Sequence, residues 1–183
     1  MSAVKKHLFT ADEFAALPSE GLRLELIRGE IVAMAPTFED HGVAALRLSI
    51  LLGQYVLASN LGRMCAAETG FLIAENPDTV RAPDLSFTSS SRVSSRPVSA
   101  WVRVMPDLVA EVVSSGDRPA EIAEKVQMWL DAGVKLVWVV YPTRQVIEVY
   151  QPERAPITLS ARATLDGGSV VPGFSVPVAQ VFE

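Results

Sequence analysis

Three acidic side chains beside apolar segments are the first candidates for chemistry. Asp84 follows Pro83 in RAPDLSFT, Asp107 follows Pro106 in MPDLVAEVV, and Glu111 stands inside the apolar part of that second segment. A carboxylate within a buried strand is costly unless it is paired, hydrogen-bonded or bound to a metal. Asp84 and Glu111 on neighbouring strand ends would offer oxygen ligands to a hard cation such as Mg²⁺.

Lys125 is a candidate partner for these acids. It lies in PAEIAEKVQMWLDAG, where apolar residues from Ile122 to Leu130 recur at helical spacing, and it falls at the border of the apolar face. A lysine there could reach back to the carboxylates and stabilise an anionic transition state or orient a water. The alternative is a surface lysine with its ammonium group in solvent, four residues from Glu121.

The segments that would position these residues follow a strand, helix, strand order. DLVAEVV is mostly apolar, the helical segment ends at Gly133, and KLVWVVY is apolar on both faces. Together they predict a βαβ crossover and a partly parallel, buried sheet. VRAPDLSFT predicts another strand, which lies at an edge or begins at Pro83, because proline cannot donate to a sheet ladder.

The N-terminal part of the chain predicts a short helix and a hairpin. Thr10 and Glu13 have the spacing of a capping box at the start of a helix that reaches about Leu17. LRLELIRGEIVAM alternates apolar and charged residues around a central Arg-Gly, which is typical of a β-hairpin. Glu25 and Glu30 flank that turn and are expected to face solvent.

Other segments predict a helix, further strands and a loop. Residues 40–58 are apolar on nearly every side and indicate a helix covered by the sheet, with Asp40 as a candidate N-cap. RMCAAETGFLIAE predicts one or two strands, and the chain from Gln145 onward predicts a hairpin and a strand-rich tail. The segment from Ser89 to Ser99 lacks apolar periodicity and is expected to form a mobile loop. Trp129 and Trp138 are interpreted as core residues.

Composition limits the class of protein. The 183 residues are 49% hydrophobic and 20% charged, which predicts one globular domain over residues 1–183. A single cysteine, Cys65, excludes an internal disulfide and thiolate-rich metal sites. The absence of about 18 consecutive apolar residues and of an apolar N-terminal signal core predicts a cytoplasmic protein without a membrane partner.

Charge argues against a protein that coats nucleic acid, since the net charge is −5. The stretch from Arg81 to Arg103 is nevertheless basic, with four arginines and the single acid Asp84. These arginines could contact phosphates, and the alternative is a solvated loop.

The ordered series of motifs resembles one known family. RAPDLSF, PDLVAEVVSS and EKVQMWLDAGVKLVWVVYP, with the earlier LELIRGEIVAM and His41 opening the next helix, resemble the Uma-two group of “putative restriction endonucleases”. That group belongs to the PD-(D/E)XK nuclease superfamily, and the resemblance covers about Thr10 to Val181. It implies an α/β (α+β) fold of the restriction-endonuclease type, a mixed β-sheet flanked by helices with N-terminal and C-terminal hairpin additions.

The resemblance also implies site residues. It makes Asp84 the superfamily aspartate, Glu111 the second carboxylate and the carbonyl of Val112 a further metal ligand. The lysine expected two residues after the glutamate is replaced by Val113. Families of this type supply the lysine from the following helix, and Lys125 matches that position.

Four further features of the sequence bear on this assignment. Asp107 lies four residues before Glu111, about 13 Å along a strand and too far to share its metal, so Asp107 is interpreted as structural. Ser114-Ser115-Gly116 replaces the usual Ser-Pro-Ser type of turn and could loosen the lysine helix. Glu68 could add an acid near the metal, and His41 could touch phosphate or the edge of the site; both are otherwise surface residues.

Three functional hypotheses follow. The first is an endonuclease that hydrolyses DNA phosphodiester bonds with Mg²⁺, or Mn²⁺ as its substitute, held by Asp84 and Glu111 and assisted by Lys125. The short chain and exposed sheet edges are compatible with a homodimer that would cut two strands. The second is a non-catalytic module of the same fold that binds protein or nucleic acid. The third, glycoside hydrolysis, is disfavoured because neither acid has a nearby aromatic cluster for sugar stacking.

Overall fold

The computed structural model describes residues 7–18, 21–93 and 101–183. Its larger sheet has six strands in the order β10-β9-β8-β7-β6-β3. β7 and β8 run parallel, and the other neighbouring pairs are antiparallel. The strands are β3 (Gly62–Ala66), β6 (Leu85–Ser89), β7 (Leu108–Val112), β8 (Leu136–Tyr141), β9 (Val146–Tyr150) and β10 (Ile157–Ser160).

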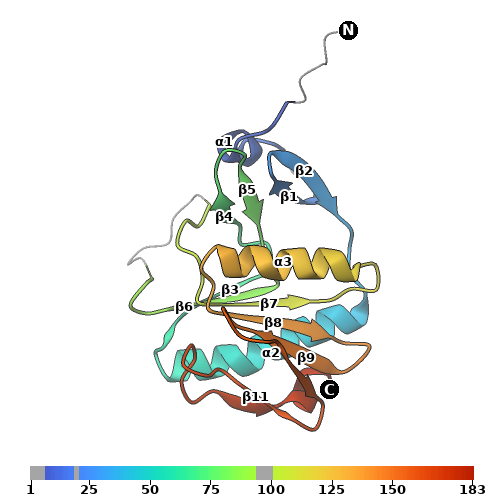
Figure 1. Ribbon diagram of the computed structural model, residues 1–183, viewed down its shortest axis with the longest axis vertical. Coiled ribbons are helices and arrows are strands. Elements are labelled where there is room, and N and C mark those ends of the chain that lie inside the picture. The colour runs from blue at the N-terminus through green and yellow to red at the C-terminus, as the bar shows by residue number, and fades with distance from the viewer. Residues whose placement is uncertain (1–6, 19–20, 94–100) are drawn as a thin grey trace.

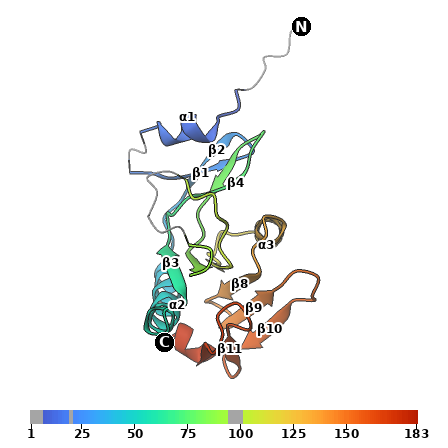
Figure 2. The same cartoon turned by 90° about the vertical axis from the view of Figure 1, so that its left-hand side faces the viewer.

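Two helices cover the two faces of this sheet (Figures 1 and 2). α2 (Glu39–Ala58) packs on one face and α3 (Pro119–Asp131) on the other. β7, α3 and β8 form the predicted βαβ crossover, and Gly133, with φ +94°, ends the helical turn before β8. The expected mixed sheet flanked by helices is confirmed.

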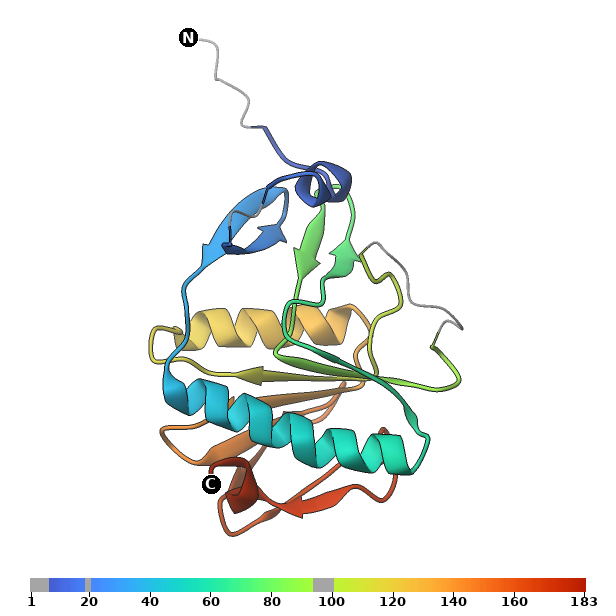
Figure 3. The ribbon, with the colours of Figure 1, turned by 180° about the vertical axis from the view of Figure 1, so that it is seen from behind.

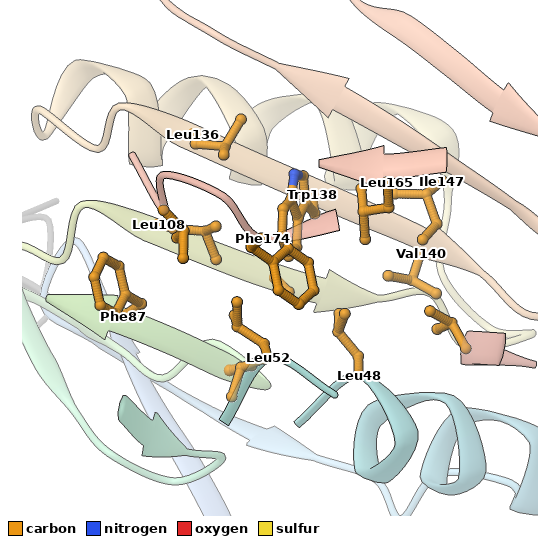
Figure 4. Packing of buried hydrophobic residues seen from close by; sticks show 14 of the residues in the cluster. Leu48, Leu52, Phe87, Leu108, Leu136, Trp138, Val140, Ile147, Leu165 and Phe174 are labelled. Carbon is orange, nitrogen blue, oxygen red and sulfur yellow. The ribbon is translucent and has the colours of Figure 1, made fainter. Parts of the chain in front are cut away.

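The main core lies between α2 and the sheet (Figure 4). Alternate residues of the strands point to this side, among them Leu108 of β7 and Trp138 of β8, and they meet Leu48 and Leu52 of α2. Phe174, from the C-terminal segment, packs against the Trp138 ring with centroids 5.9 Å apart. The opposite face carries a second cluster around Trp129 of α3, so both tryptophans are core residues as predicted.

α2 differs from its prediction at its start. It begins at Glu39 with Phe38 as N-cap, so the prediction of Asp40 as the cap was wrong. Phe38 has extended backbone angles, so the helix proper starts after it. The acids Glu39 and Asp40 then lie in the first turn, where they interact favourably with the positive end of the helix dipole. By length and composition α2 could cross a membrane, but a stripe of its side chains, including Leu48 and Leu52, is buried against the sheet.

A smaller sheet in the order β2-β1-β5-β4 stands above the larger one in Figure 1. α1 (Ala11–Ala15) packs on it and begins with the predicted capping box. The predicted hairpin is confirmed, and Arg28 and Gly29 form its turn with φ of +51° and +79°. The strands are β1 (Arg23–Ile27), β2 (Glu30–Met34), β4 (Phe71–Ala74) and β5 (Thr79–Arg81).

The segment VRAPDLSFT is not one strand. It ends β5 in the smaller sheet at Arg81 and starts β6 in the larger sheet at Leu85, and β6 lies between β7 and β3 rather than at an edge. Pro83 lies between the two strands, where it interrupts no ladder. Asp84 therefore stands at the junction of the two sheets (Figure 3 shows the chain crossing between them).

The C-terminal part forms the predicted hairpin and strand-rich tail. β9 and β10 pair antiparallel, and β11 (Thr164–Asp166) pairs with β12 (Ser175–Pro177), followed by the short helix η1 (Val178–Val181). RMCAAETGFLIAE forms two strands, β3 and β4, as expected. Of the predicted loop from Ser89 to Ser99, residues 94–99 lie outside the described residues.

Candidate active site

Asp84 and Glu111 come together where the sheets meet. The register of β6 with β7 pairs Leu85 with Ala110, so Asp84, one residue before β6, stands opposite Glu111. Asp84 Oδ2 accepts the backbone N–H of Val112 at 2.8 Å. The two acids are only 7% and 6% exposed. The structure thus brings together the two carboxylates that the sequence singled out.

Lys125 completes the group from α3. Its Nζ donates to Glu111 Oε2 at 2.7 Å, while Nε1 of Trp129, one helical turn further, donates to Oε1 at 2.7 Å. The Lys125 side chain is 20% exposed, so it is not a surface lysine with its ammonium group in open solvent. The Ser114-Ser115-Gly116 turn has not moved α3 away from the acids.

The pKa values of the two acids are shifted in opposite directions. Burial raises the pKa of Glu111, and the negative charge of Asp84 adds to this rise against the opposing charge of Lys125. Burial also acts to raise the pKa of Asp84, but contacts with His41 and the Val112 N–H outweigh it and hold that pKa below its usual value. Burial acts to lower the pKa of Lys125, yet the charge of Glu111 raises it overall. Asp84 is the acid that ionises more readily, and Lys125 stays cationic.

Asp84 has two further neighbours with nitrogen donors. His41 Nε2 lies 3.3 Å from Asp84 Oδ2, and Nη2 of Arg23 lies 3.6 Å from Oδ1. His41, in the first turn of α2, is buried and contacts Asp84, so it is a site residue rather than a surface one. Glu68 sits in an exposed turn with φ +71°, outside this acid pair, and lines a separate cavity beside Arg23.

A buried ion pair next to this group was not predicted. Glu25 is 1% exposed, so the expectation that it faces solvent was wrong; Glu30 is exposed as expected. Arg81 Nε and Nη2 both lie 2.9 Å from Glu25 Oε2, and the Ala82 N–H reaches Oε1 at 3.3 Å. β1 is a central strand of the smaller sheet rather than half of a free hairpin, because it also pairs with β5. The Arg81 side chain of β5 covers Glu25.

A cavity of about 390 Å³ opens on these residues. Glu111, Lys125 and Arg81 line it, together with apolar side chains of β1 and β2 such as Ile27 and Met34. It therefore lies between the N-terminal hairpin and α3. A ligand in this cavity would meet the two cations and four carboxylates, those of Glu111, Asp117, Glu121 and Glu124.

The three described arginines of the arginine-rich stretch are each paired with an acid. Arg81 is paired with Glu25, Arg92 with Asp107 at 2.7 Å and Arg103 with Glu75 at 3.0 Å. Arg96, the fourth arginine, lies outside the described residues. Only Arg81 among the described three lines the cavity beside Glu111.

Most of the chain matches a known protein family. The model of a family described as “Uma2: Putative restriction endonuclease” matches residues 11–179. The chain belongs to the Uma2 family. No relative with a curated description matches it.

A solved structure shares the fold of this Uma2 chain. It is the crystal structure of “a putative nuclease belonging to DUF820 from Anabaena variabilis ATCC 29413”, with a TM-score of 0.80, 20% sequence identity, and coverage of 95% of this chain and 97% of that chain. At this identity the likeness shows a common fold. The predicted resemblance and fold class are confirmed, and family and fold together support a nuclease function.

Two carboxylates of the Uma2 site suit a divalent cation, although they do not form a complete protein cage around it. Within residues 7–18, 21–93 and 101–183, no group of three or more His, Cys, Asp or Glu side chains is arranged to hold a metal. Mg²⁺, however, keeps several waters and commonly takes one or two carboxylates from the protein. Asp84 and Glu111 are two adjacent hard donors whose mutual repulsion would be relieved by a cation, so they fit that pattern.

Asp107 of the Uma2 chain has a different environment from Asp84. Its Oδ1 accepts from Arg92 at 2.7 Å and Lys135 at 2.8 Å, and Oδ2 accepts the Ser89 N–H at 2.8 Å. Burial acts to raise the pKa of Asp107, but these three donors outweigh it and lower the pKa to about 2. These contacts fix the start of β7 to the end of β6, which agrees with a structural role.

Asp107→Asn is therefore expected to cost stability. Because the folded-state pKa lies below the ordinary 3.8, the stabilising effect is present above that value and is lost as the pH falls toward about 2. We expect the variant to lose about 1–2 kcal/mol at pH 7, a value reduced by the solvent screening of partly exposed Arg92 and Lys135. Urea unfolding from pH 2 to 7 measures this. A variant as stable as wild type at pH 7 would contradict the structural assignment.

Proposed function

We propose that this Uma2 protein is a Mg²⁺-dependent endonuclease that hydrolyses DNA phosphodiester bonds. The observation that supports this most directly is the 2.7 Å contact from Lys125 Nζ to Glu111 Oε2, beside Asp84 on the neighbouring strand and at the wall of an open cavity. These three residue types are also the ones that the family resemblance assigns to the reaction. A non-catalytic module would have no need of a buried Glu111 beside Asp84.

Each residue has a role in this proposal. Asp84 and Glu111 would hold the ion, with the Val112 carbonyl as a further ligand, and Mn²⁺ would substitute for Mg²⁺. When bound, the ion would polarise the phosphate and lower the pKa of a bound water. Lys125 contributes a fixed positive charge at Glu111, which offsets charge that develops on the phosphate and helps to position the attacking water.

His41 and Trp129 position the acids. His41 stands against Asp84, and the Trp129 indole holds one oxygen of Glu111 while Lys125 holds the other. Carboxylates fixed in this way need little rearrangement before a cation binds. Glu111 comes from β7, His41 from α2, and Lys125 and Trp129 from α3, while Asp84 lies in the short connection between β5 and β6.

Metal removal tests the proposal without knowledge of the target sequence. Titration calorimetry of the wild-type protein with Mg²⁺ and Mn²⁺ is expected to show binding. Cleavage of a supercoiled plasmid and of linear duplexes is expected with either ion, to stop with EDTA, and to return when excess metal is added. Absence of binding by both ions would remove the metal site, and cleavage that continues in EDTA would contradict the proposed chemistry.

A further inference from the structure

Arg23, on the first position of β1, has an unused hydrogen-bond donor. Its Nε is buried and has no partner, a condition that among the described side-chain nitrogens and oxygens is shared only with Trp138 Nε1. Nη2 makes two long contacts, 3.4 Å to the Ala82 carbonyl and 3.6 Å to Asp84 Oδ1. Buried donors are rarely left unpaired in folded proteins. The guanidinium is therefore held beside Asp84 with capacity to bind an acceptor.

Arg23 lines a second cavity. This cavity, of about 510 Å³, lies between α1, β1 and β5 and is also lined by Arg81, Ala82 and Glu68. Arg81 thus lines both cavities, while Glu111 lines the first and Arg23 joins the second to Asp84. Both arginines therefore line the second cavity, with Arg23 beside Asp84 and Arg81 at the wall that this cavity shares with the first.

Arg81 is oriented by Glu25 and still has a donor to offer. Nε and Nη2 are both held by the buried Glu25 carboxylate. Nη1 contacts only the thioether of Met128, at 4.0 Å, and sulfur is a weak acceptor. Glu25 therefore holds Arg81 at the wall shared by the two cavities and leaves Nη1 available to a stronger acceptor. This accounts for a buried ion pair that the three proposed catalytic residues do not use.

We propose that Arg23 and Arg81 form a phosphate clamp that holds a backbone phosphate of one DNA strand in the second cavity, beside the acid pair. The clamp rests on the proposed nuclease function and adds to it a second phosphate site next to the acid pair, so that the substrate is a polynucleotide strand. Guanidinium groups suit this role because their planar donors match phosphate oxygens, and such contacts position DNA without reading its sequence. Arg81 contributes Nη1, and Arg23 contributes its guanidinium, whose Nη2 makes only long contacts and whose buried Nε gains a partner when the side chain turns toward the phosphate.

Glu68 provides a contrast within the same cavity. Its exposed carboxylate lines the cavity with Arg23, so a phosphate bound there would be repelled by Glu68. The clamp therefore requires that neutralising Arg23 and neutralising Glu68 change DNA affinity in opposite directions. If Glu68 instead served the metal, its neutralisation would weaken metal binding.

The salt dependence of DNA binding tests the clamp. Fluorescence anisotropy with a fluorescein-labelled 20-base-pair duplex, in EDTA and at 50–200 mM NaCl, gives the slope of log K against log salt for each variant. Each lost phosphate contact on duplex DNA reduces that slope by about 0.9. Arg23→Gln is expected to lose about one contact and to weaken binding about tenfold, whereas Glu68→Gln is expected to strengthen it. Arg162→Gln, at an exposed arginine between β10 and β11, is the matched control and should keep the wild-type slope.

The outcomes separate the clamp from the function on which it rests. Arg23→Lys keeps the charge but lacks the planar guanidinium group, so it should retain the slope and lose part of the affinity. If Arg23 only neutralises Asp84, Arg23→Gln will unfold at lower urea with an unchanged slope, and the clamp is then wrong although the nuclease proposal stands. If wild type binds no duplex at any salt concentration, the proposed function fails first.

Discussion

Asp84→Asn and Glu111→Gln are each expected to reduce metal-dependent DNA cleavage by about 10³-fold or more while the protein stays folded. Both changes remove the negative charge that would attract the ion. Both keep an oxygen that accepts from the present donors, the Val112 N–H for residue 84 and Lys125 or Trp129 for residue 111. The loss should therefore appear in metal affinity and rate rather than in the fold.

The second Pro-Asp dipeptide supplies the matched control for these variants. Asp107→Asn makes the same change of charge at a buried aspartate whose partners are Arg92, Lys135 and the Ser89 N–H. It should be less stable but should bind Mn²⁺ and cleave DNA as wild type does under conditions where it is folded. Calorimetry and plasmid cleavage on the three variants measure this. Metal binding by Asp84→Asn equal to that of Asp107→Asn would refute the assignment of Asp84.

Lys125→Met is expected to lower the cleavage rate by about 10²–10³-fold while metal binding at pH 8 changes little. Methionine has a similar length but no charge to offset the charge that develops on the phosphate. The carboxylates that would bind the ion remain, although loss of the cation favours the protonated form of Glu111, which is why the titration is set at pH 8. A rate loss without an affinity loss would identify Lys125 as acting on the reaction.

Lys135→Met is the control for the lysine. Lys135 makes an equally short contact to a buried carboxylate, 2.8 Å to Asp107 Oδ1, but lies outside the site. It should retain full activity. Cleavage by Lys125→Met at the wild-type rate would show that the helix-borne lysine takes no part in the reaction. Parallel loss of metal binding and rate would assign it to holding Glu111 in place.

The sequence predicted the acid pair and the lysine because local patterns determine their positions. The βαβ order places Glu111 and the following helix next to each other, and helical spacing puts Lys125 at the border of the apolar face. The rise of a strand separates Asp107 from Glu111. His41 could be named as a candidate from its place at the helix start, but its 3.3 Å approach to Asp84 depends on how α2 packs.

Contacts between distant segments were not predictable in this way. Glu25 follows an alternating pattern that normally faces solvent, and only the pairing of β1 with β5 brings Arg81 over it. The split of VRAPDLSFT between two sheets also depends on contacts with distant segments. Both halves have strand propensity, and the nine residues themselves do not show that the halves pair with different partners. The same packing reveals Arg23 as a neighbour of Asp84.

The crossing of the chain from one sheet to the other has a mechanical consequence. Asp84 is covalently continuous with β5 of the smaller sheet through residues 82–83, yet it is hydrogen-bonded to β7 of the larger one. The smaller sheet therefore cannot detach as an independent unit without pulling on the aspartate. Anything that fastens Asp84 to Glu111 also fastens the two sheets to each other. Binding of an ion at the site and cooperative unfolding of the whole chain therefore both depend on this one connection.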